Sequence, residues 1–179
     1  MFYGTSITHG ACASRPGMPH PAILGRRLDR PVINLGFSGN GKMEKEVGQY
    51  LTELNASVFV IDCLPNMDAA EITQRTVPLV QQLRAAHPTT PVVLVEDRSY
   101  SGSWVLSSQK RRNESSREAL RGEYRKLLDS GVTGLHYIDG ESLLGADRDD
   151  TTDGSHPSDL GFLRHADAME SVIRSALSS

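Results

Sequence analysis

The sequence lacks the features that mark disulfide-rich, membrane-spanning or nucleic-acid-binding proteins. Only two of its 179 residues are cysteines, Cys12 and Cys63, which are too few for a disulfide framework and are expected to be free buried thiols. No apolar run approaches the ~20 residues that span a bilayer, so we expect no membrane insertion. The formal net charge of -3 provides no excess of positive charge for binding nucleic acid. What remains is an ordinary globular composition, 38% hydrophobic and 23% charged.

The chain also has no glycine-rich phosphate loop, no internal repeat and no Pro/Gly-rich linker. The turn Gly39–Lys42 is too short for the phosphate loop that a flavodoxin-like nucleotide binder would need. The basic run Lys110–Arg112 is followed closely by Glu114 and Glu118, which favours a solvated helix face over a phosphate-binding patch. Residues 1–179 are therefore expected to form one domain, long enough to bury a core.

Apolar β-branched segments alternate with amphipathic segments, a pattern typical of an α/β fold with a parallel sheet. Two of them are near-continuous apolar runs, as expected for strands covered on both faces. The expected strands are Met1–Tyr3, Pro31–Leu35, Ser57–Asp62, Pro91–Glu96 and Leu135–Asp139. The expected helices include Glu71–Ala86, Ser115–Ser130 and Asp159–Leu177. The prediction is a three-layer α/β/α sandwich around a five-stranded parallel sheet.

The start of the chain is unusual for such a sheet. Met1–Tyr3 supplies only three residues of strand before a glycine, whereas a strand normally has about five or six. We therefore expect the chain to be a domain excised from a longer protein. No signal peptide is present in the sequence, and both a cytoplasmic location and secretion after loss of an N-terminal segment stay open.

Small, polar and glycine residues follow the predicted strands, and they are expected to meet at the carboxyl edge of the sheet, where open α/β sheets bind ligands. Ser6 follows the first strand and a glycine, at the expected start of a helix. The local alternatives for this serine are an exposed nucleophile on a sharp turn and a simple helix N-cap. The pattern Gly-x-Ser-x-Gly does not apply, because position 8 is Thr.

A serine hydroxyl needs a base to take its proton, and the base needs an acid to orient it. Asp153 and His156 are three residues apart just before the last helix, so both side chains can face one point. Two other interpretations stay open for this segment. One is an acidic loop that ends in a capped helix with Pro157 in its first turn. The other is a metal site with Asp149 and Asp150 as further ligands, although no second histidine is spaced to join them.

Acyl transfer also needs hydrogen-bond donors for the oxyanion, and two candidates lie in strand-to-helix loops. Gly39 can offer a backbone N–H, and Asn66 carries a side-chain amide. Each is weak evidence alone, since a loop glycine is often a turn residue and an asparagine after proline is often a helix cap.

Taken together, four blocks resemble the SGNH (GDSL-type) hydrolase superfamily over almost the whole chain. They are Gly4–Thr8, Asn34–Gly39, Asn66 after the third strand, and Asp153–His156, in the order of that superfamily. The resemblance implies a flavodoxin-like fold with Ser6 as nucleophile and His156 as base, oriented by Asp153. It also implies an oxyanion hole formed by Gly39, Asn66 and the Ser6 amide, without cofactor or metal.

Two departures from the superfamily pattern bear on the substrate. The usual aspartate before the serine is Thr5 here, and the third block reads Leu64-Pro65-Asn66-Met67 in place of Gly-x-Asn-Asp. These features are similar to a bacterial subgroup akin to carbohydrate acetylesterases, in which the domain often follows a β-rich module. The resemblance implies a short-chain esterase, acting on acetyl esters and on carbohydrates.

The segment Ser99–Ser116 is expected to be a long loop that shapes the pocket. It contains the chain's single tryptophan, Trp104, for which a sugar-stacking position and a packed loop anchor are both open. Arg98 and Tyr100 are further candidates for contact with substrate oxygens. Rival functions are a lysophospholipase or thioesterase of the same superfamily, and a catalytically idle binding domain that has kept the pocket. The sequence does not specify the oligomeric state.

Overall fold

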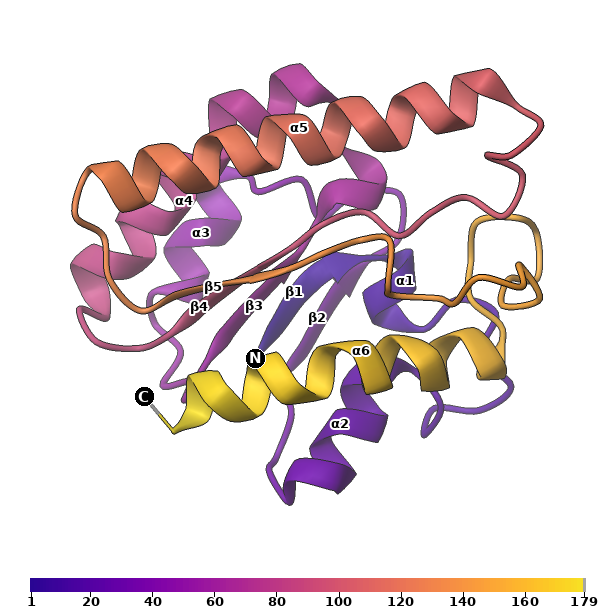
Figure 1. The fold of residues 1–179 in the computed structure, drawn as a ribbon. Coiled ribbons are helices and arrows are strands. Elements are labelled where there is room, and N and C mark those ends of the chain that lie inside the picture. Colours follow the sequence, from indigo (N-terminus) through magenta and orange to yellow (C-terminus); the bar gives the residue numbers. More distant parts are fainter. Residues whose placement is uncertain (179) are drawn as a thin grey trace.

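Five parallel strands form the central sheet of the computed structural model, which describes residues 1–178 (Figure 1). Their order across the sheet is β2-β1-β3-β4-β5, the flavodoxin-like arrangement, in which the chain reverses its winding direction between β1 and β3. The strands are β1 (Phe2–Thr5), β2 (Asn34–Phe37), β3 (Phe59–Asp62), β4 (Val92–Val95) and β5 (Leu135–Ile138). The predicted α/β/α fold with a five-stranded parallel sheet is confirmed.

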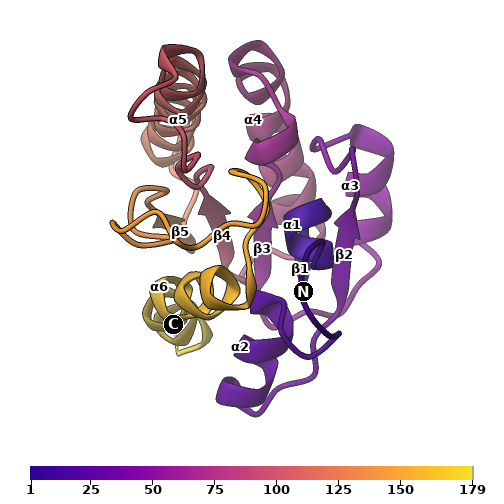
Figure 2. The same cartoon turned by 90° about the vertical axis from the view of Figure 1, so that its right-hand side faces the viewer.

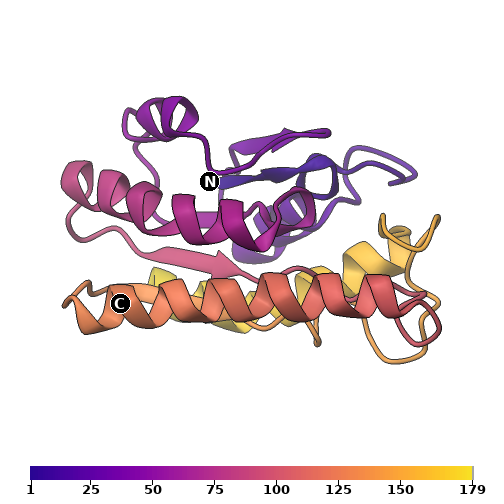
Figure 3. The same ribbon diagram turned by 90° about the horizontal axis from the view of Figure 1, so that it is seen from above.

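Helices cover both faces of this sheet. Figure 2 shows helices on one face and on the other, with the short α1 at the carboxyl end of β1. Figure 3 shows α4 and α5 running side by side. The first face carries α3 (Lys45–Leu51), α4 (Ala69–Ala86) and α5 (Ser107–Asp129), and the second carries α2 (His20–Leu28) and α6 (Asp159–Leu177). The remaining helical turns are α1 (Ser6–His9) and the 3-10 turn η1 (Leu64–Asn66).

The alternation of side chains along the strands divides the core into two layers. On β3, Phe59 and Ile61 pack toward the three-helix face, whereas Val60 packs toward α2 and α6. On β4, Leu94 lies in the first layer and Val93 in the second. All five side chains are fully buried, which explains why these strands are apolar at every position except Asp62 at the carboxyl end of β3.

The strand boundaries differ from the sequence-based prediction by up to three residues, most of all in β1 and β2. β1 does not stop at Tyr3, because Gly4 and Thr5 continue the ladder and pair with Gly36 and Phe37 of β2. β2 begins three residues later than predicted, at Asn34. Its predicted start was Pro31, which has no backbone N–H to give to a ladder.

The largest error concerns α5. The sequence predicted a long loop over Ser99–Ser116 and a helix that begins at Ser115. In the structure the helix begins at Ser107, so the loop after β4 ends at Leu106. Residues 107–112 of this helix are mostly exposed and polar. They pack against no apolar surface, so they show none of the hydrophobic periodicity from which a helix is predicted. The other two helix predictions are close: α4 begins two residues before Glu71, and α6 spans Asp159–Leu177 as predicted. Within residues 1–178, no helix is both long and apolar enough to cross a membrane.

Candidate active site

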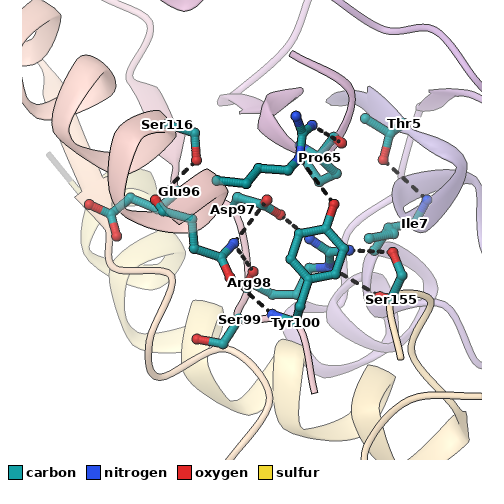
Figure 4. Close-up of polar contacts among 12 residues, drawn as sticks. Thr5, Ile7, Pro65, Glu96, Asp97, Arg98, Ser99, Tyr100, Ser116 and Ser155 are labelled. Atoms are coloured by element: carbon teal, nitrogen blue, oxygen red, sulfur yellow. Dashed lines mark hydrogen bonds and ion pairs between the residues drawn. The ribbon is translucent and has the colours of Figure 1, made fainter. Parts of the chain in front are cut away.

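Ser6 lies where β1 passes into α1, under strong local constraints. A Cβ atom at Gly4 would lie 2.1 Å from Thr8 Oγ1 and 2.5 Å from the Asp62 carbonyl oxygen, so only glycine fits there. The N-cap of α1 is Thr5, whose Oγ1 accepts the Ile7 N–H at 3.2 Å (Figure 4). Ser6 is therefore the first residue of the helix and not its cap. Its hydroxyl is left for another partner.

That partner is His156, which comes from the far end of the chain. Ser6 Oγ lies 2.9 Å from His156 Nε2, and His156 Nδ1 lies 2.7 Å from Asp153 Oδ2. The other carboxylate oxygen, Oδ1, accepts the backbone N–H groups of Ser155 at 2.9 Å and His156 at 2.7 Å. The structure thus brings together the predicted nucleophile, base and orienting acid in one hydrogen-bonded chain.

The electrostatics of Asp153 suit the role of orienting acid. Partial burial alone would raise the pKa of its carboxyl, but the hydrogen bonds from His156 and Ser155 lower that pKa to about 2. The carboxylate therefore stays ionised at neutral pH and favours the tautomer of His156 that carries its proton on Nδ1. In that tautomer Nε2 has a free lone pair facing Ser6.

A tight loop before α6 presents Asp153 and His156. Thr151 and Pro157 form an antiparallel bridge, and the Thr152 N–H donates to the His156 carbonyl at 2.8 Å. Pro157 is thus not in the first turn of a helix, as one interpretation of the sequence had it. The helix begins after Ser158, which caps α6 by accepting the Gly161 N–H. The loop closes on itself, and this fixes the spacing of the two side chains.

The candidate oxyanion donors lie next to each other at the reversal point between β1 and β3. Asn66, in η1, donates from its side-chain Nδ2 to the carbonyl of Asn40 at 2.7 Å, which orients the amide and leaves its second N–H. Gly39 has a φ of +71°, and nothing approaches its Cβ position within 4 Å. A Cβ at Gly41 would lie 2.0 Å from the Gly4 carbonyl oxygen, so this loop presses on the end of β1 beside Ser6.

The three candidate substrate contacts lie in different surroundings. Arg98 is a correction to the prediction: its side chain is buried, so it is not available to substrate oxygens. Its guanidinium binds Asp97 and Ser155 and lies 4.1 Å from the ring centre of Tyr100, which is half-buried. Trp104 is 67% exposed, with the guanidinium of Arg148 at 5.4 Å from its ring centre. This exposure contradicts the packed loop anchor, and the sugar-stacking position stays a prediction.

The ligand set of the metal hypothesis does not come together as the sequence suggested. Among the described residues, the group that includes Asp153 and His156 has Cys12 as its third member, with ligand atoms within 4.8 Å of one another. Asp150 is buried and accepts a hydrogen bond from Ser101 at 3.2 Å instead. Cys12 is exposed, not buried as expected, because it lies in the loop after α1 at the edge of the site. Its position beside the candidate base was not predicted, since nothing in the sequence around it signals that contact.

Comparison with known proteins agrees with this geometry. Residues 1–174 match the model of the GDSL-like lipase/acylhydrolase family. The chain therefore belongs to that family, which confirms the assignment to the SGNH (GDSL-type) superfamily. No significant relative is found among curated protein sequences.

Solved structures show the same fold. A Bacteroides ovatus protein assigned as a GDSL-like lipase is 40% identical with a TM-score of 0.95, over 99% of this chain and 52% of its own length. A family two carbohydrate esterase from Clostridium thermocellum, solved with cellohexaose, is 16% identical with a TM-score of 0.73, over 99% of this chain and 63% of that chain. A carbohydrate acetylesterase family member from Sinorhizobium meliloti is 20% identical with a TM-score of 0.69, over 99% and 98%. The chain thus spans about half the length of the Bacteroides protein.

Proposed function

We propose that this chain is a serine esterase that removes short acyl groups, acetyl above all, from hydroxyl-bearing substrates such as sugars. The observation that supports the chemistry is the chain of contacts from Ser6 Oγ through His156 to Asp153, at 2.9 and 2.7 Å. These are the distances at which an imidazole can take a serine proton while a carboxylate orients the ring.

The proposed reaction has two halves. In the first, Ser6 Oγ bonds to the ester carbonyl carbon while His156 Nε2 takes the hydroxyl proton. The negative charge on the carbonyl oxygen is met by the second N–H of Asn66 and by the backbone N–H groups of Gly39 and Ser6. The carbon–oxygen bond to the alcohol then breaks, and the alcohol leaves with the proton held by His156. In the second half, water attacks the acyl-serine in the same way and releases the carboxylic acid.

The substrate part of the proposal is supported by the polar surroundings of the loop after β4. A cavity of about 210 Å³ adjoins this loop, with polar side chains from Ser99, Ser101, Ser103, Glu141, Arg148 and Asp150 in its wall. The Ser101 N–H donates to the Gly154 carbonyl at 3.1 Å, which places the cavity wall against the segment that presents His156. Hydroxyl, carboxylate and guanidinium groups suit the hydroxyls of a sugar better than an alkyl chain.

The decisive experiment is labelling with a fluorophosphonate, which reacts covalently with activated serines. We expect the wild-type chain to be labelled at Ser6 and to hydrolyse p-nitrophenyl acetate. Ser6→Ala should lose both labelling and about 10⁴-fold or more of kcat, because the triad nucleophile is gone. Ser171→Ala, an exposed serine on α6, is the matched control and should behave as wild type. A folded wild-type chain that is neither labelled nor active would instead be the idle binding domain.

A further inference from the structure

Arg98 is the largest fully buried side chain of the described residues, and it holds the segment that carries the candidate base. It is the third residue after the end of β4 at Val95. Its Nε donates to the Ser155 carbonyl at 3.0 Å, and a terminal nitrogen donates to Ser155 Oγ. Ser155 lies between Asp153 and His156 in the chain. Figure 4 shows Arg98 enclosed by Asp97, Tyr100 and Ser155.

A guanidinium cannot lose its charge to become neutral when it is buried, so each of its contacts resists displacement. Here the charge is balanced by Asp97, which is itself fully buried. The other Asp97 oxygen accepts a hydrogen bond from the side-chain amide of Asn113, on α5, at 3.1 Å. This contact fixes the position of Asp97 in the ion pair. Any shift of Ser155 would break two bonds to a buried charge. The segment from Asp153 to His156 is therefore anchored at Ser155.

A second set of contacts begins on the other side of Arg98. The guanidinium carbon lies 4.1 Å from the ring centre of Tyr100. The Tyr100 hydroxyl accepts a hydrogen bond from Arg112 Nε at 3.1 Å. Arg112 in turn donates to the carbonyls of Pro65 at 2.9 Å and Met67 at 3.3 Å. These two residues flank Asn66, the candidate oxyanion donor.

We propose that Arg98, Tyr100 and Arg112 form a positioning bridge that sets the oxyanion donor and the catalytic base at a fixed distance from each other. None of the three touches reacting atoms in this arrangement, and each acts through a neighbour of a candidate catalytic residue. The proposal rests on the serine esterase function proposed above. It has a catalytic rationale because a misplacement of about 1 Å in a catalytic group can cost about 10²-fold in rate.

The sharpest test removes one atom of the bridge. Tyr100→Phe keeps the ring on Arg98 but deletes the hydroxyl that Arg112 contacts. We expect kcat on p-nitrophenyl acetate to fall about tenfold, the equivalent of one hydrogen bond, with KM and thermal unfolding nearly unchanged. Arg121→Lys is the matched control, because Arg121 lies on α5 and binds Glu96 outside the bridge. It should keep wild-type kcat.

A double-mutant cycle separates positioning from a general structural effect. If Tyr100 acts through the Asn66 segment, its substitution should cost little once Asn66 is already alanine. An equal loss in the wild-type and Asn66→Ala backgrounds would overturn the proposal, as would a Tyr100→Phe variant with wild-type kcat. Arg98→Lys retains the charge but not the two hydrogen bonds to Ser155. This variant should have a lower kcat than Tyr100→Phe and an altered pH profile of kcat. If that variant does not fold, the Tyr100 cycle still decides.

Labelling keeps this test distinct from that of the proposed function. If a fluorophosphonate labels Ser6 in the wild type and the Tyr100 cycle is additive, the bridge is wrong and the esterase stands. If the wild-type chain is neither labelled nor active, both proposals fail together.

Discussion

Thr5 shows how a single residue prepares the candidate nucleophile. Because the Thr5 hydroxyl caps α1, the next residue is not needed as a cap, and Ser6 Oγ is available to His156. The replacement of the family's usual aspartate by threonine therefore preserves the cap, since both side chains can accept the Ile7 N–H. The departure in the first block alters no contact that the chemistry needs.

Asn66 is the residue whose role is most easily isolated by substitution. Its amide is held by the Asn40 carbonyl, so one N–H stays pointed away from that bond. We predict that Asn66→Ala lowers kcat by roughly 10²–10³ with little change in KM, because the donor serves charge that develops only in the transition state. Steady-state kinetics with p-nitrophenyl acetate provide the measurement. Asn55→Ala, exposed before β3, is the control. An effect confined to KM would make Asn66 a ground-state contact instead.

The two cysteines should differ sharply in reactivity. Cys12 is exposed beside Asp153 and His156, whereas Cys63 is fully buried, and burial raises the pKa of its thiol well above the usual value. We predict that N-ethylmaleimide modifies Cys12 alone and inactivates the enzyme by blocking the approach to His156. Mass spectrometry and residual activity measure this. Cys12→Ser should keep its activity in the reagent, while Cys63→Ser should be inactivated as wild type is. Full activity after stoichiometric labelling of Cys12 would contradict the prediction.

At the scale of elements, α2 and α6 meet through two buried histidines. The rings of His20 and His165 are stacked, with centroids 4.1 Å apart, and none of their four nitrogens has a hydrogen-bond partner among the described residues. His20 Nε2 lies 3.4 Å from Asp62 Oδ2 without forming a hydrogen bond. Burial lowers the pKa of His20 to about 3 and that of His165 to about 3. Burial raises the pKa of Asp62, so this carboxyl takes up a proton more readily in the folded chain. This partly offsets the effect of the histidines on stability in acid.

These shifts make the α2–α6 contact sensitive to acid. The unfolded chain binds protons at these histidines below about pH 6.5, and the folded chain does so only near pH 3. The contribution of the two neutral histidines to the free energy of unfolding is therefore complete above about pH 6.5 and is lost as the pH falls toward 3. Between pH 7 and pH 5 the wild-type chain should lose free energy of unfolding, and we predict that His165→Phe reduces this loss by about 2 kcal/mol. The unfolding temperature of the variant should therefore fall less over that range than that of the wild type. His9→Gln, at an exposed position, should show the wild-type slope. Equal slopes in all three proteins would refute the prediction.

The elements also show what the sequence can and cannot predict. The strand predicted at Pro91–Glu96 was predictable because burial on both faces leaves an apolar signature in all four residues of β4, Val92–Val95. The first turns of α5 were not, because they cover no apolar surface. Ser6, Asp153 and His156 could be proposed as a group because their chemistry requires fixed residue types in fixed blocks, and the structure brings the three side chains into contact. The burial of Arg98 was missed because the partner that holds its ion pair in place, Asn113, is supplied by a helix fifteen residues further on. A charged residue after a strand is normally exposed.

At the scale of the whole molecule, the carboxyl edge of the sheet collects every part of the candidate site. Parallel strands bring the ends of β1, β2 and β3 together, and the loop before α6 closes over them (Figure 2). Phe37, at the end of β2, is 40% exposed beside this site, and a second group of exposed apolar side chains includes Trp104 in the loop after β4. Val105 and Leu106 are also exposed there, at 62% and 49%. Because all three side chains are open to solvent, we expect this patch to bind one face of a sugar ring better than a long acyl chain.

The acyl preference follows from this surface. A long-chain lipase must shield its substrate's tail, and each buried methylene contributes only about 0.8 kcal/mol, so a tail needs a continuous apolar channel. The serine-rich loop after β4 and the polar cavity beside it offer none. We therefore predict the highest kcat/KM for acetate in a p-nitrophenyl ester series, with a fall beyond four carbons, and deacetylation of acetylated xylose. Trp104→Ala should raise KM for the acetylated sugar and leave p-nitrophenyl acetate unaffected, since only the sugar would use the ring. A series that peaks at eight or more carbons would favour a lysophospholipase-like enzyme instead, because only a buried tail gains affinity with each added methylene.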